Sequence, residues 1–389
     1  MINVVVMNVS LIEGMAGTMR VKNLVDPLYE KGKIDLSNLS LVHTYEKSKI
    51  GQKGSMNGME YEYIGYYNPL NIIEILRFYR SGYAFLEKHY NSNYKNVLYN
   101  YGYPDIKNIL LLMKAKKIGY KIIFDIVEDK RYERKFSNFL GWLRVKSSVF
   151  LIKKIGQLAD GIVVISSYLD KRIKEIVGSK IEISLIPITV NFKHFPQKSK
   201  RTDPSNVKIF YGGSFFLGKD GVEYLLEAFN VLSKKYSTIT LLLSGKSVVK
   251  EEMDKINKII NNNRKIVFLG YLDSEEYYKV LNSCDIFCMP RNNSLFANAG
   301  FPFKLGEFLA TGKGVVATKV GDVSQYLTNM ENAMLIEPES VDEIVKAIEY
   351  LVLNTDEIAR LGDSAIGVAR ENFDSDKLSE SLFSLIVKI

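Results

Sequence analysis

Cysteine and histidine are scarce in this chain of 389 residues, which holds two cysteines and three histidines. Cys284 and Cys288 stand close together in "SCDIFCMP", and no spacing typical of a zinc site connects them with a histidine. We therefore interpret both as reduced thiols of a buried strand and expect no metal there. Low use of cysteine favours a reducing compartment, and we expect a cytoplasmic location.

Long apolar runs are also missing, since no segment approaches the ~18 apolar residues that a membrane-spanning helix needs. The first residues, "MINVVVMNV", predict a strand rather than a signal peptide, because a basic start and a cleavage site are absent. No block rich in lysine and arginine carries interleaved aromatics, so we expect no nucleic-acid partner. The net charge of +8 favours an anionic partner, either nucleotide phosphate or an anionic lipid surface.

Short β-rich runs alternate with helical periodicity along the chain, and the hydrophobic fraction of 47% is typical of a globular protein. This alternation predicts an α/β fold with parallel sheets. The polar segment 197–206, "QKSKRTDPSN", interrupts it and is interpreted as a linker. We predict two Rossmann-like, doubly wound domains facing across a cleft, 1–196 and 207–374, with the last helix, 375–389, packing back on the first.

The segment "GFPFKLGEFLATGKGVVATKVGD", from Gly300 to Asp322, reads as a helix that opens at a proline and leads into a buried strand. A helix N-terminus offers free backbone N–H groups and a partial positive charge, which suit phosphate. Lys304 lies at this start, and Glu307, one turn later, is placed to reach a sugar hydroxyl. An ordinary amphipathic helix with a solvated lysine explains the stretch equally well.

Three further loops in the second half contain glycine and lie after predicted strands. Glycine lets backbone approach a ligand closely, and lysine neutralises phosphate charge. The spacing of a Walker loop is absent, and each loop alone is compatible with a plain β–α turn. Four loops at one sheet edge would surround a single crevice. The three supply Gly212, Gly213 and Lys219, then Gly245 and Lys246, then Gly270 and Tyr271.

The order of these segments resembles the retaining glycosyltransferases of family 4, which have the GT-B fold. The resemblance covers nearly the whole chain and is strongest from Lys208 to Pro338. It is carried by "YGGSFFLGKDGVEYLLEAF", "LLLSGKS", "IVFLGYLDSEEYYKVLNSCDIFCMP", "FPFKLGEFLATGKGVVATKVGDVSQYL" and "ENAMLIEP". It implies a nucleotide-diphosphate sugar held by the second domain and an acceptor held by the first.

The resemblance also assigns roles to residues of the second domain. Lys219 matches the lysine that contacts the donor diphosphate, and Glu307 matches the glutamate that binds the ribose hydroxyls; we predict both to be catalytic. Ser214 stands where the family has arginine, so we expect Lys304 to supply that cationic contact. The predicted donor-binding set is Gly17, Gly213, Ser214, Lys219, Gly245, Lys246, Gly270, Tyr271, Asn298, Ala299, Gly300, Phe301, Phe303, Lys304, Leu305 and Glu307.

Two departures from the family pattern concern the transferred sugar and the acceptor. Ala299 replaces the first glutamate of the family's Glu-x7-Glu motif, and Asn298 is a substitute contact to sugar hydroxyls. In the first half, "FDIVEDKR" offers Asp125, Glu128 and Asp129 but no histidine. We predict Glu128 and Asp129 to be catalytic, as acids that bind acceptor hydroxyls, although a solvated loop with Lys130 and Arg131 as salt partners is equally compatible. Gly17 matches a glycine turn facing the donor phosphates, or is only a turn residue.

The resemblance implies a front-face reaction that retains the anomeric configuration. No Asp-x-Asp metal motif lies near a strand end, so we expect no cofactor and no metal, with lysine and helix dipoles meeting the phosphate charge. We expect a UDP-sugar as donor and hexosyl or N-acetylhexosaminyl transfer. Rival interpretations are a nucleotide-sugar epimerase of the same architecture, and a catalytically silent partner or glycan-binding protein, which Ala299 and Ser214 favour.

The acceptor is expected to be a glycan or lipid-linked glycan, as in the synthesis of bacterial surface polysaccharide or glycoconjugates. Residues 130–154 place Phe136, Phe139, Leu140, Leu143 and Phe150 at roughly helical spacing among many lysines and arginines. A basic amphipathic helix of this kind can lie on an anionic membrane. We therefore expect a peripheral position on the inner membrane face, while a core-facing helix with a basic solvent side is the alternative.

Overall fold

A computed structural model describes residues 1–9, 15–42, 51–56, 59–66, 71–133, 139–195, 205–247 and 249–389. The chain divides into two compact units. The first comprises Met1–Ile186 and Ser375–Ile389, and the second comprises Pro187–Asp374. Within the described ranges, no helix is long and apolar enough to cross a membrane.

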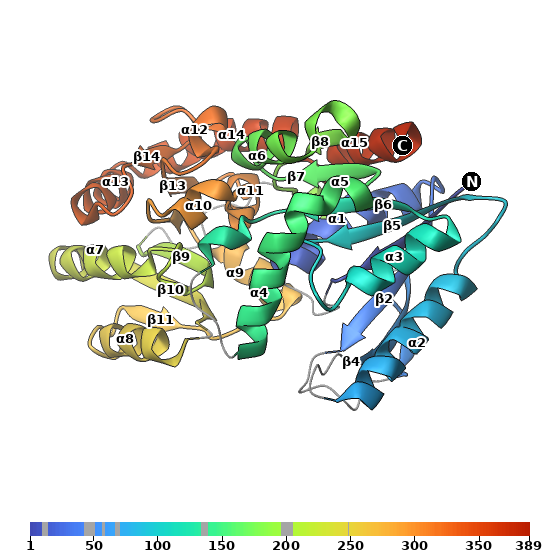
Figure 1. The fold of residues 1–389 in the computed structure, drawn as a ribbon. Helices are drawn as coiled ribbons and strands as arrows, with labels where there is room; N and C mark the ends of the chain where they lie inside the picture. Colours follow the sequence, from blue (N-terminus) through green and yellow to red (C-terminus); the bar gives the residue numbers. More distant parts are fainter. Residues whose placement is uncertain are drawn as a thin grey trace. The chain divides into compact units, whose positions relative to one another are not determined.

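The first unit is built on an eight-stranded sheet with the order β3-β4-β2-β1-β5-β6-β7-β8 (Figure 1). β3 pairs antiparallel with β4, and the other neighbouring strands are parallel. The strands are β1 (Ile2–Met7), β2 (Asp35–Val42), β3 (Lys53–Met56), β4 (Met59–Tyr66), β5 (Lys95–Tyr101), β6 (Lys121–Ile126), β7 (Gly161–Val164) and β8 (Glu182–Leu185).

Helices cover this sheet on both faces, and Figure 1 shows α3 and α4 in front of its strands. This cover explains why β1, β5, β6 and β7 read as continuous apolar runs rather than alternating ones. The last helix packs against the first helix and against β7 and β8. The helices are α1 (Ala16–Glu30), α2 (Ile72–Lys88), α3 (Ile109–Ile118), α4 (Phe139–Leu151), α5 (Ile155–Leu158), α6 (Ser167–Val177) and α15 (Ser375–Lys388).

The second unit is built on a six-stranded parallel sheet with the order β11-β10-β9-β12-β13-β14. Its strands are β9 (Val207–Ser214), β10 (Ile239–Lys246), β11 (Ile266–Phe268), β12 (Ile286–Met289), β13 (Gly314–Thr318) and β14 (Met334–Ile336). The predicted α/β class and GT-B type of fold, with two parallel-sheet units, are confirmed. Because all six strands are parallel, their carboxyl ends lie along one edge of the sheet.

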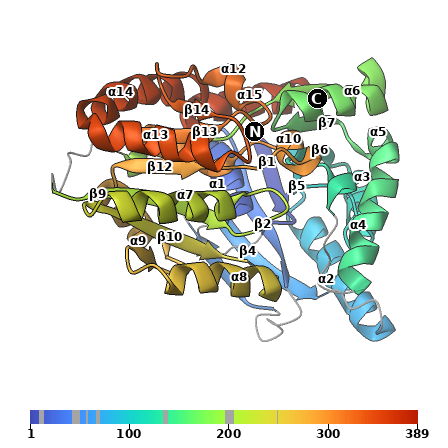
Figure 2. The ribbon, with the colours of Figure 1, turned by 90° about the vertical axis from the view of Figure 1, so that its left-hand side faces the viewer.

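Helices again cover the second sheet, and Figure 2 shows α7 and α13 in front of its strands. Burial of their apolar faces against β9, β10 and β13 forms one hydrophobic core that contains Leu225, Phe229 and Ile348. The helices are α7 (Val222–Lys235), α8 (Lys250–Asn261), α9 (Ser274–Ser283), α10 (Leu295–Ala299), α11 (Phe303–Ala310), α12 (Val323–Tyr326), α13 (Val341–Leu353) and α14 (Thr355–Asn372).

The units meet in sequence after Ile186, whereas the predicted boundary lies at residue 196. The physical reason is that residues 187–195 make their contacts within the second unit. Val190 N donates a 2.7 Å hydrogen bond to Phe373 O, and His194 stacks on Tyr278 with ring centroids 4.2 Å apart. Most of the predicted linker, residues 197–204, lies outside the described residues.

Candidate donor and acceptor sites

Glycines at the carboxyl ends of β9 and β10 lie side by side in the second unit. Gly213 and Gly245 are register partners, and both have a positive φ, of 151° and 135°. A Cβ atom on Gly245 would lie 1.8 Å from the Gly213 carbonyl oxygen. Gly245 N also donates a 2.8 Å hydrogen bond to Gly270 O. The three predicted glycine loops therefore lie next to one another, and backbone approaches backbone too closely for a side chain at Gly245.

The loop that carries Lys219 is fastened to the segment after β12. Ser294 Oγ donates to Gly218 O at 2.8 Å, and Asn292 Nδ2 donates to Leu217 O at 2.9 Å. The Lys219 ammonium lies 4.9 Å from the ring centroid of Phe296 in α10, at the distance of a cation–π contact. Lys219 is thereby held beside the segment that contains Asn298 and Ala299.

Glu307 of α11 is buried, with 5% of its surface exposed, and two consecutive tyrosines of α9 donate hydrogen bonds to it. Tyr277 Oη lies 2.9 Å from Oε2, and Tyr278 Oη lies 3.2 Å from Oε1. Burial first, and then the nearby carboxylate, raise the pKa of both phenols well above the ordinary value. Both therefore stay protonated and act as donors to Glu307.

Lys304 completes this arrangement. Its Nζ lies 3.7 Å from Glu307 Oε2 and 3.7 Å from the ring centroid of Tyr277. Burial lowers the pKa of Lys304, and the charge and hydrogen bond of Glu307 oppose that shift. The predicted phosphate contact by Lys304 stays a prediction, because the ammonium in this structure faces the carboxylate.

The hydrogen bonds leave Glu307 with accepting capacity. A carboxylate offers about four acceptor positions, and the two phenols use one on each oxygen. One position remains on Oε1, whereas the Lys304 ammonium lies 3.7 Å from Oε2, so Glu307 can still accept a hydrogen bond from a hydroxyl of a ligand. The two phenols therefore hold the carboxylate in place and leave it able to accept a further hydrogen bond.

Sequence reasoning missed Tyr277, Tyr278 and their aromatic neighbours. Tyr278 stacks on His194 and makes an edge contact with Phe195, with ring centroids 5.5 Å apart. The pair of tyrosines in "SEEYYKVL" was visible, but no local pattern predicts that both phenols turn toward one carboxylate. The available signal was the helical position of Tyr277, which places it on the apolar face with Leu281.

Several other predicted donor-binding residues are hydrogen-bonded or buried within the second unit. Asn298 Oδ1 accepts from Gly321 N at 3.0 Å, and its Nδ2 donates to Asn293 Oδ1 at 2.9 Å. The side chains of Ala299, Phe301 and Leu305 are buried, with Phe301 packed on Tyr326 and Phe373. Any contact of these three with a ligand is left to their backbone. Gly300 is also buried and Phe303 is half-buried at the start of α11.

Ser214 and Tyr271, which also belong to the predicted donor-binding set, are exposed. Ser214 is exposed, and its Oγ accepts from Phe216 N at 3.2 Å, so the position that carries arginine in the resembling family holds a turn here. Tyr271 is 48% exposed, and the Lys246 ammonium lies 5.6 Å from its ring centroid. Lys246 and Tyr271 thus form a cation–aromatic pair beside the Gly245 and Gly270 loops.

In the first unit, Asp125 is not a solvated or substrate-facing acid. Arg20 donates to both carboxylate oxygens, from Nε at 2.8 Å and from Nη2 at 3.0 Å, and Tyr99 Oη adds a bond of 2.8 Å. Asp125 and Arg20 are 0% and 1% exposed. Asp125, the first of the three candidate acids, therefore has its oxygens engaged in a buried ion pair.

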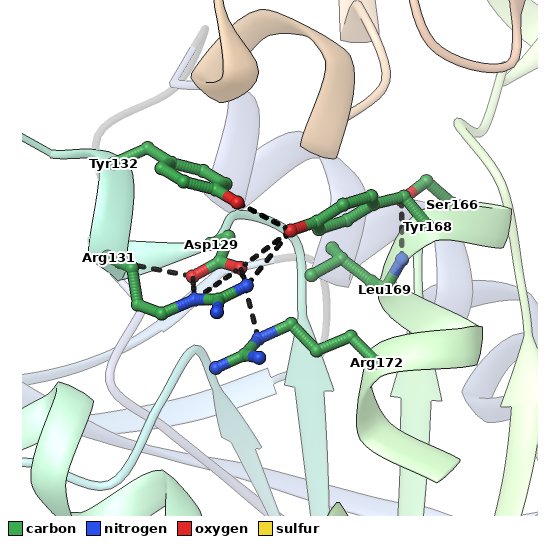
Figure 3. Close-up of polar contacts among 7 residues, drawn as sticks. All are labelled: Asp129, Arg131, Tyr132, Ser166, Tyr168, Leu169 and Arg172. Carbon is green, nitrogen blue, oxygen red and sulfur yellow. Dashed lines mark hydrogen bonds and ion pairs between the residues drawn. The ribbon is translucent and has the colours of Figure 1, made fainter. Parts of the chain in front are cut away.

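Asp129 lies in a cluster of two arginines and two tyrosines (Figure 3). Arg131 donates from Nη2 to Oδ2 at 2.7 Å and from its backbone N to Oδ1 at 3.0 Å, and Arg172 Nε lies 3.0 Å from Oδ2. Tyr168 Oη donates to Oδ2 at 3.3 Å and meets Tyr132 Oη at 2.9 Å. The carboxylate is 0% exposed and its acceptor positions are filled. The predicted salt partner Arg131 is present, but Asp129 is buried rather than solvated.

Glu128 faces a pocket of about 310 Å³ at the carboxyl ends of β1, β5 and β6. Its Oε2 accepts from Lys130 Nζ at 3.1 Å, and Lys130 also donates to Glu133 at 2.8 Å. Of the two acids predicted to bind acceptor, the geometry favours Glu128. Gly17, in the first turn of α1, packs against Tyr101, whose Cε1 would lie 2.7 Å from an added Cβ, so glycine is required there for packing.

Helix α4 carries large apolar side chains on its solvent side. Phe139 and Phe150 are 68% and 61% exposed, and Trp142, stacked on Phe139, is 39% exposed. Arg144 and Lys146 on the same helix are exposed as well. The alternative of a wholly core-facing apolar side is wrong for these aromatics. Phe136 lies outside the described residues.

Comparison with known proteins finds similarity to glycosyltransferases. Residues 192–367 match the family model described as "Glycosyl transferases group 1". The chain is 26% identical over 325 residues to an uncharacterized glycosyltransferase of Methanocaldococcus jannaschii, covering 72% of this chain and 79% of that protein. It is 26% identical over 184 residues to one of Haemophilus influenzae, where it spans 47% of this chain and 50% of that protein.

Two further similarities name nucleotide sugars. The chain is 24% identical over 242 residues to a GDP-mannose-dependent monoacylated phosphatidylinositol monomannoside mannosyltransferase of Corynebacterium glutamicum, covering 59% of this chain and 62% of that protein. The solved structure of Anabaena HepE in complex with UDP-glucose superposes with a TM-score of 0.73 at 15% identity, covering 100% of both chains. This likeness shows the fold.

Proposed function

We propose that this chain, whose residues 192–367 match the family model of glycosyl transferases group 1, moves a sugar from a nucleotide-diphosphate sugar to a glycan or lipid-linked acceptor. One observation carries the proposal: Glu307 is buried, is held by two phenols, and keeps an acceptor position on Oε1. In an ordinary amphipathic helix a solvated glutamate would need no such support.

Around that glutamate, the neighbouring loops suit a diphosphate. The backbone at Gly213, Gly245 and Gly270 is free of Cβ atoms, and Lys219 and Lys246 bring cations to the same loops. We propose that these groups stabilise the charge that builds on the leaving nucleotide. Loss of one such contact is expected to lower the rate on the order of 10²-fold.

We further propose a retaining, front-face mechanism without a metal ion. Neither Asp125 nor Asp129 has a free carboxylate to serve as a base, which supports proton transfer to a diphosphate oxygen of the donor. In that step the acceptor hydroxyl attacks the anomeric carbon, the bond to the diphosphate breaks, and the departing oxygen takes the proton. The protein then supplies position and charge.

For the donor, we propose a UDP-sugar. HepE binds UDP-glucose, whereas the Corynebacterium relative is named for GDP-mannose, so the two similarities point to different bases. The structural likeness covers the whole chain and the sequence match covers 59% of it, and this broader likeness supports uridine. A hexose is the sugar that the structural likeness favours.

The testing experiment is a thermal-shift screen of UDP- and GDP-sugars, with magnesium and with EDTA. A donor at a hundred times its dissociation constant adds ~2.7 kcal/mol of stability. We expect a shift with one UDP-sugar that is equal with magnesium and EDTA and that Glu307→Ala abolishes. Glu275→Ala, which removes an exposed glutamate of α9, is the matched control and should retain the shift.

No shift with any donor would overturn the proposal in favour of a catalytically silent partner. The hypothesis of a catalytically silent partner is also supported by Ala299, because the sugar side of the site then lacks the first glutamate of the Glu-x7-Glu motif. A shift that depends on magnesium would keep the transferase and overturn the metal-free mechanism.

We also propose that the chain lies on an anionic membrane through α4. Exposed Phe139 and Phe150 stand on the same helix as Arg144 and Lys146, so apolar insertion and charge attraction act together. Co-sedimentation with vesicles containing anionic lipid should retain the chain, and the Phe139→Ser/Phe150→Ser double variant should release it. Equal sedimentation with purely neutral vesicles would contradict the role of charge. Bacterial surface polysaccharide or glycoconjugate synthesis on the inner membrane face is the setting that such binding suits.

A further inference from the structure

The pocket beside Glu128 lies wholly within the first unit and has walls of two kinds. Its apolar wall comes from residues that flank β1, α1 and β6 and from α4, and its polar wall comes from the loop before α3, from the turn after β6 and from α4. The apolar wall contains Val9, Met15, Val127 and Val145, and the charged groups are Asp105, Lys107, Glu128, Lys130 and Arg144.

The two acids of the polar wall already have partners. Asp105 Oδ1 accepts from the backbone N of Lys107 and of Asn108, each at 2.9 Å. Glu128 is paired with Lys130, which is also shared with Glu133. Both carboxylates are therefore engaged already, that of Asp105 by backbone N–H groups before α3 and that of Glu128 by Lys130.

The other two cations are not neutralised in this way. Among the described residues, neither Lys107 nor Arg144 forms an ion pair within 4.0 Å, and both line the pocket. Burial lowers the pKa of Lys107, Asp105 opposes that shift, and Arg144 adds to it. Burial therefore disfavours the protonated lysine, and an anion in the pocket would favour it.

Tyr103 also lines the pocket. Its side chain is 5% exposed, and its hydroxyl is buried and has no hydrogen-bond acceptor among the described residues. Burial and then the charge of Asp129 raise the pKa of Tyr103, so the phenol stays protonated, although the charge of Arg172 and a hydrogen bond with it oppose the rise. A buried donor without an acceptor is costly, and an anionic oxygen in the pocket would relieve that cost.

We propose that this pocket binds a phosphate group of the acceptor, with Lys107 and Arg144 as the cations and Tyr103 as a neutral donor. The inference rests on the proposed function, because it names the class of acceptor that this transferase uses. Arginine matches phosphate with two parallel hydrogen bonds, and lysine adds a point charge. The volume beyond a phosphate, bounded by Tyr101 and Val145, is suited to the sugar or alcohol that carries it.

Trp142 provides a direct reading of binding. It is the single tryptophan of the chain and stands two residues before Arg144 on α4. The probes are a hexose 1-phosphate, the matching unphosphorylated hexose, and vesicles with or without phosphatidic acid. We expect saturable quenching with hexose 1-phosphate, at least tenfold weaker binding in Lys107→Ala and in Arg144→Ala, and no binding of the hexose.

Matched variants keep the test decisive. Lys146→Ala removes an exposed cation of the same helix outside the pocket and should leave the affinity unchanged. Arg144→Lys and Lys107→Arg should recover part of the affinity, and Tyr103→Phe should weaken it by a smaller factor. These conservative variants also serve if an alanine variant fails to fold. Equal affinity in all pocket variants, or no saturable binding by the unaltered chain, overturns the proposal.

The two sources of phosphate are separated by the vesicle arm. If phosphatidic acid competes with hexose 1-phosphate and both depend on Lys107, the acceptor phosphate belongs to a lipid headgroup. If vesicles bind but Lys146→Ala weakens their binding as much as Lys107→Ala does, general positive surface charge explains binding and the pocket is overturned. The donor thermal shift, measured in the same variants, should stay intact, so that failure of the pocket is distinguishable from failure of the donor site.

Discussion

The phenol of Tyr277 on α9 donates a 2.9 Å hydrogen bond to Oε2 of Glu307 on α11, and both side chains are buried. This bond fixes the carboxylate before any ligand arrives. Tyr277→Phe keeps the ring that lies under Lys304 and removes only the donor. Since a hydrogen bond to a charged group contributes about 1.5–3 kcal/mol, we expect donor affinity to fall by roughly tenfold or more. Calorimetric titration with the donor found in the screen measures it. Tyr350→Phe, which removes a phenol that donates to Glu357 of α14, is the control, and equal affinities in both variants would contradict a positioning role.

The glycine pair of the donor loops predicts a sharp difference between two alanine substitutions. Gly245→Ala would place a Cβ 1.8 Å from Gly213 O, at a φ of 135°, so β9 and β10 must separate locally. Gly270→Ala also has a positive φ, of 68°, but meets nothing within 4 Å. We expect Gly270→Ala to cost about 1–2 kcal/mol of unfolding free energy and Gly245→Ala clearly more. Urea denaturation followed by circular dichroism measures both. Similar midpoints would show that the loops tolerate separation.

Arg20 and Asp125 predict a stability effect without a direct effect on the donor. Asp125→Ala leaves a buried guanidinium without its partner, which is expected to cost about 3–5 kcal/mol. The exposed pair Lys279–Glu275 is the control, and Glu275→Ala should cost under about 1 kcal/mol. The double variant Arg20→Met/Asp125→Leu should recover much of the loss, because no charge is left unpaired. A double variant as unstable as Asp125→Ala would contradict this account.

Restoring the first glutamate of the Glu-x7-Glu motif at Ala299 is not expected to restore its function. Its side chain is 0% exposed in α10, and a glutamate there must place a carboxylate among Phe296 and other buried groups. Burial of an unpaired charge is costly, so we expect Ala299→Glu to lower the melting temperature and not to raise turnover. Ala299→Ser, of similar size, should be milder. An active and equally stable Ala299→Glu variant would show that the site accepts the acid through a shift of α10.

The regular elements could be predicted from sequence because their patterns are local. The apolar runs of β6, β9 and β13 and the periodicity of α13 end close to the predicted residues. β3 and β8 were not predicted, because the former contains a glycine and the latter, "EISL", is short and half-exposed. The unit boundary was predicted at 196 because composition changes there, whereas Val190 and His194 make their contacts with residues far along the chain.

Only those parts of the candidate site that depend on a single residue type, such as glycine, could be predicted from sequence. Gly245 and Gly270 could be picked out because both adopt a positive φ that favours glycine. That their loops lie close together follows from the parallel pairing of the strands that precede them. Arg20 and Asp125 stand 105 positions apart, and Tyr277 and Glu307 stand 30 apart. Such partners depend on tertiary packing, so local spacing could not assign Asp125 to a buried ion pair or two tyrosines to Glu307.

The chain passes between its units twice, after Ile186 and after Asp374, and the isolated bridge between Val190 and Asp374 brings those two passages together. Topologically, the second unit is an insertion into the first. Its ends are adjacent, so residues 187–374 can be excised as one continuous piece and the gap closed by a short loop. The first unit has no such continuity, since α15 packs against α1, β7 and β8 and contributes Leu382 and Ile386 to their core. A protease that cuts the two passages would leave the host as two chains held together by noncovalent contacts alone, among them the ion pairs of Glu380 with Lys31 and Lys33.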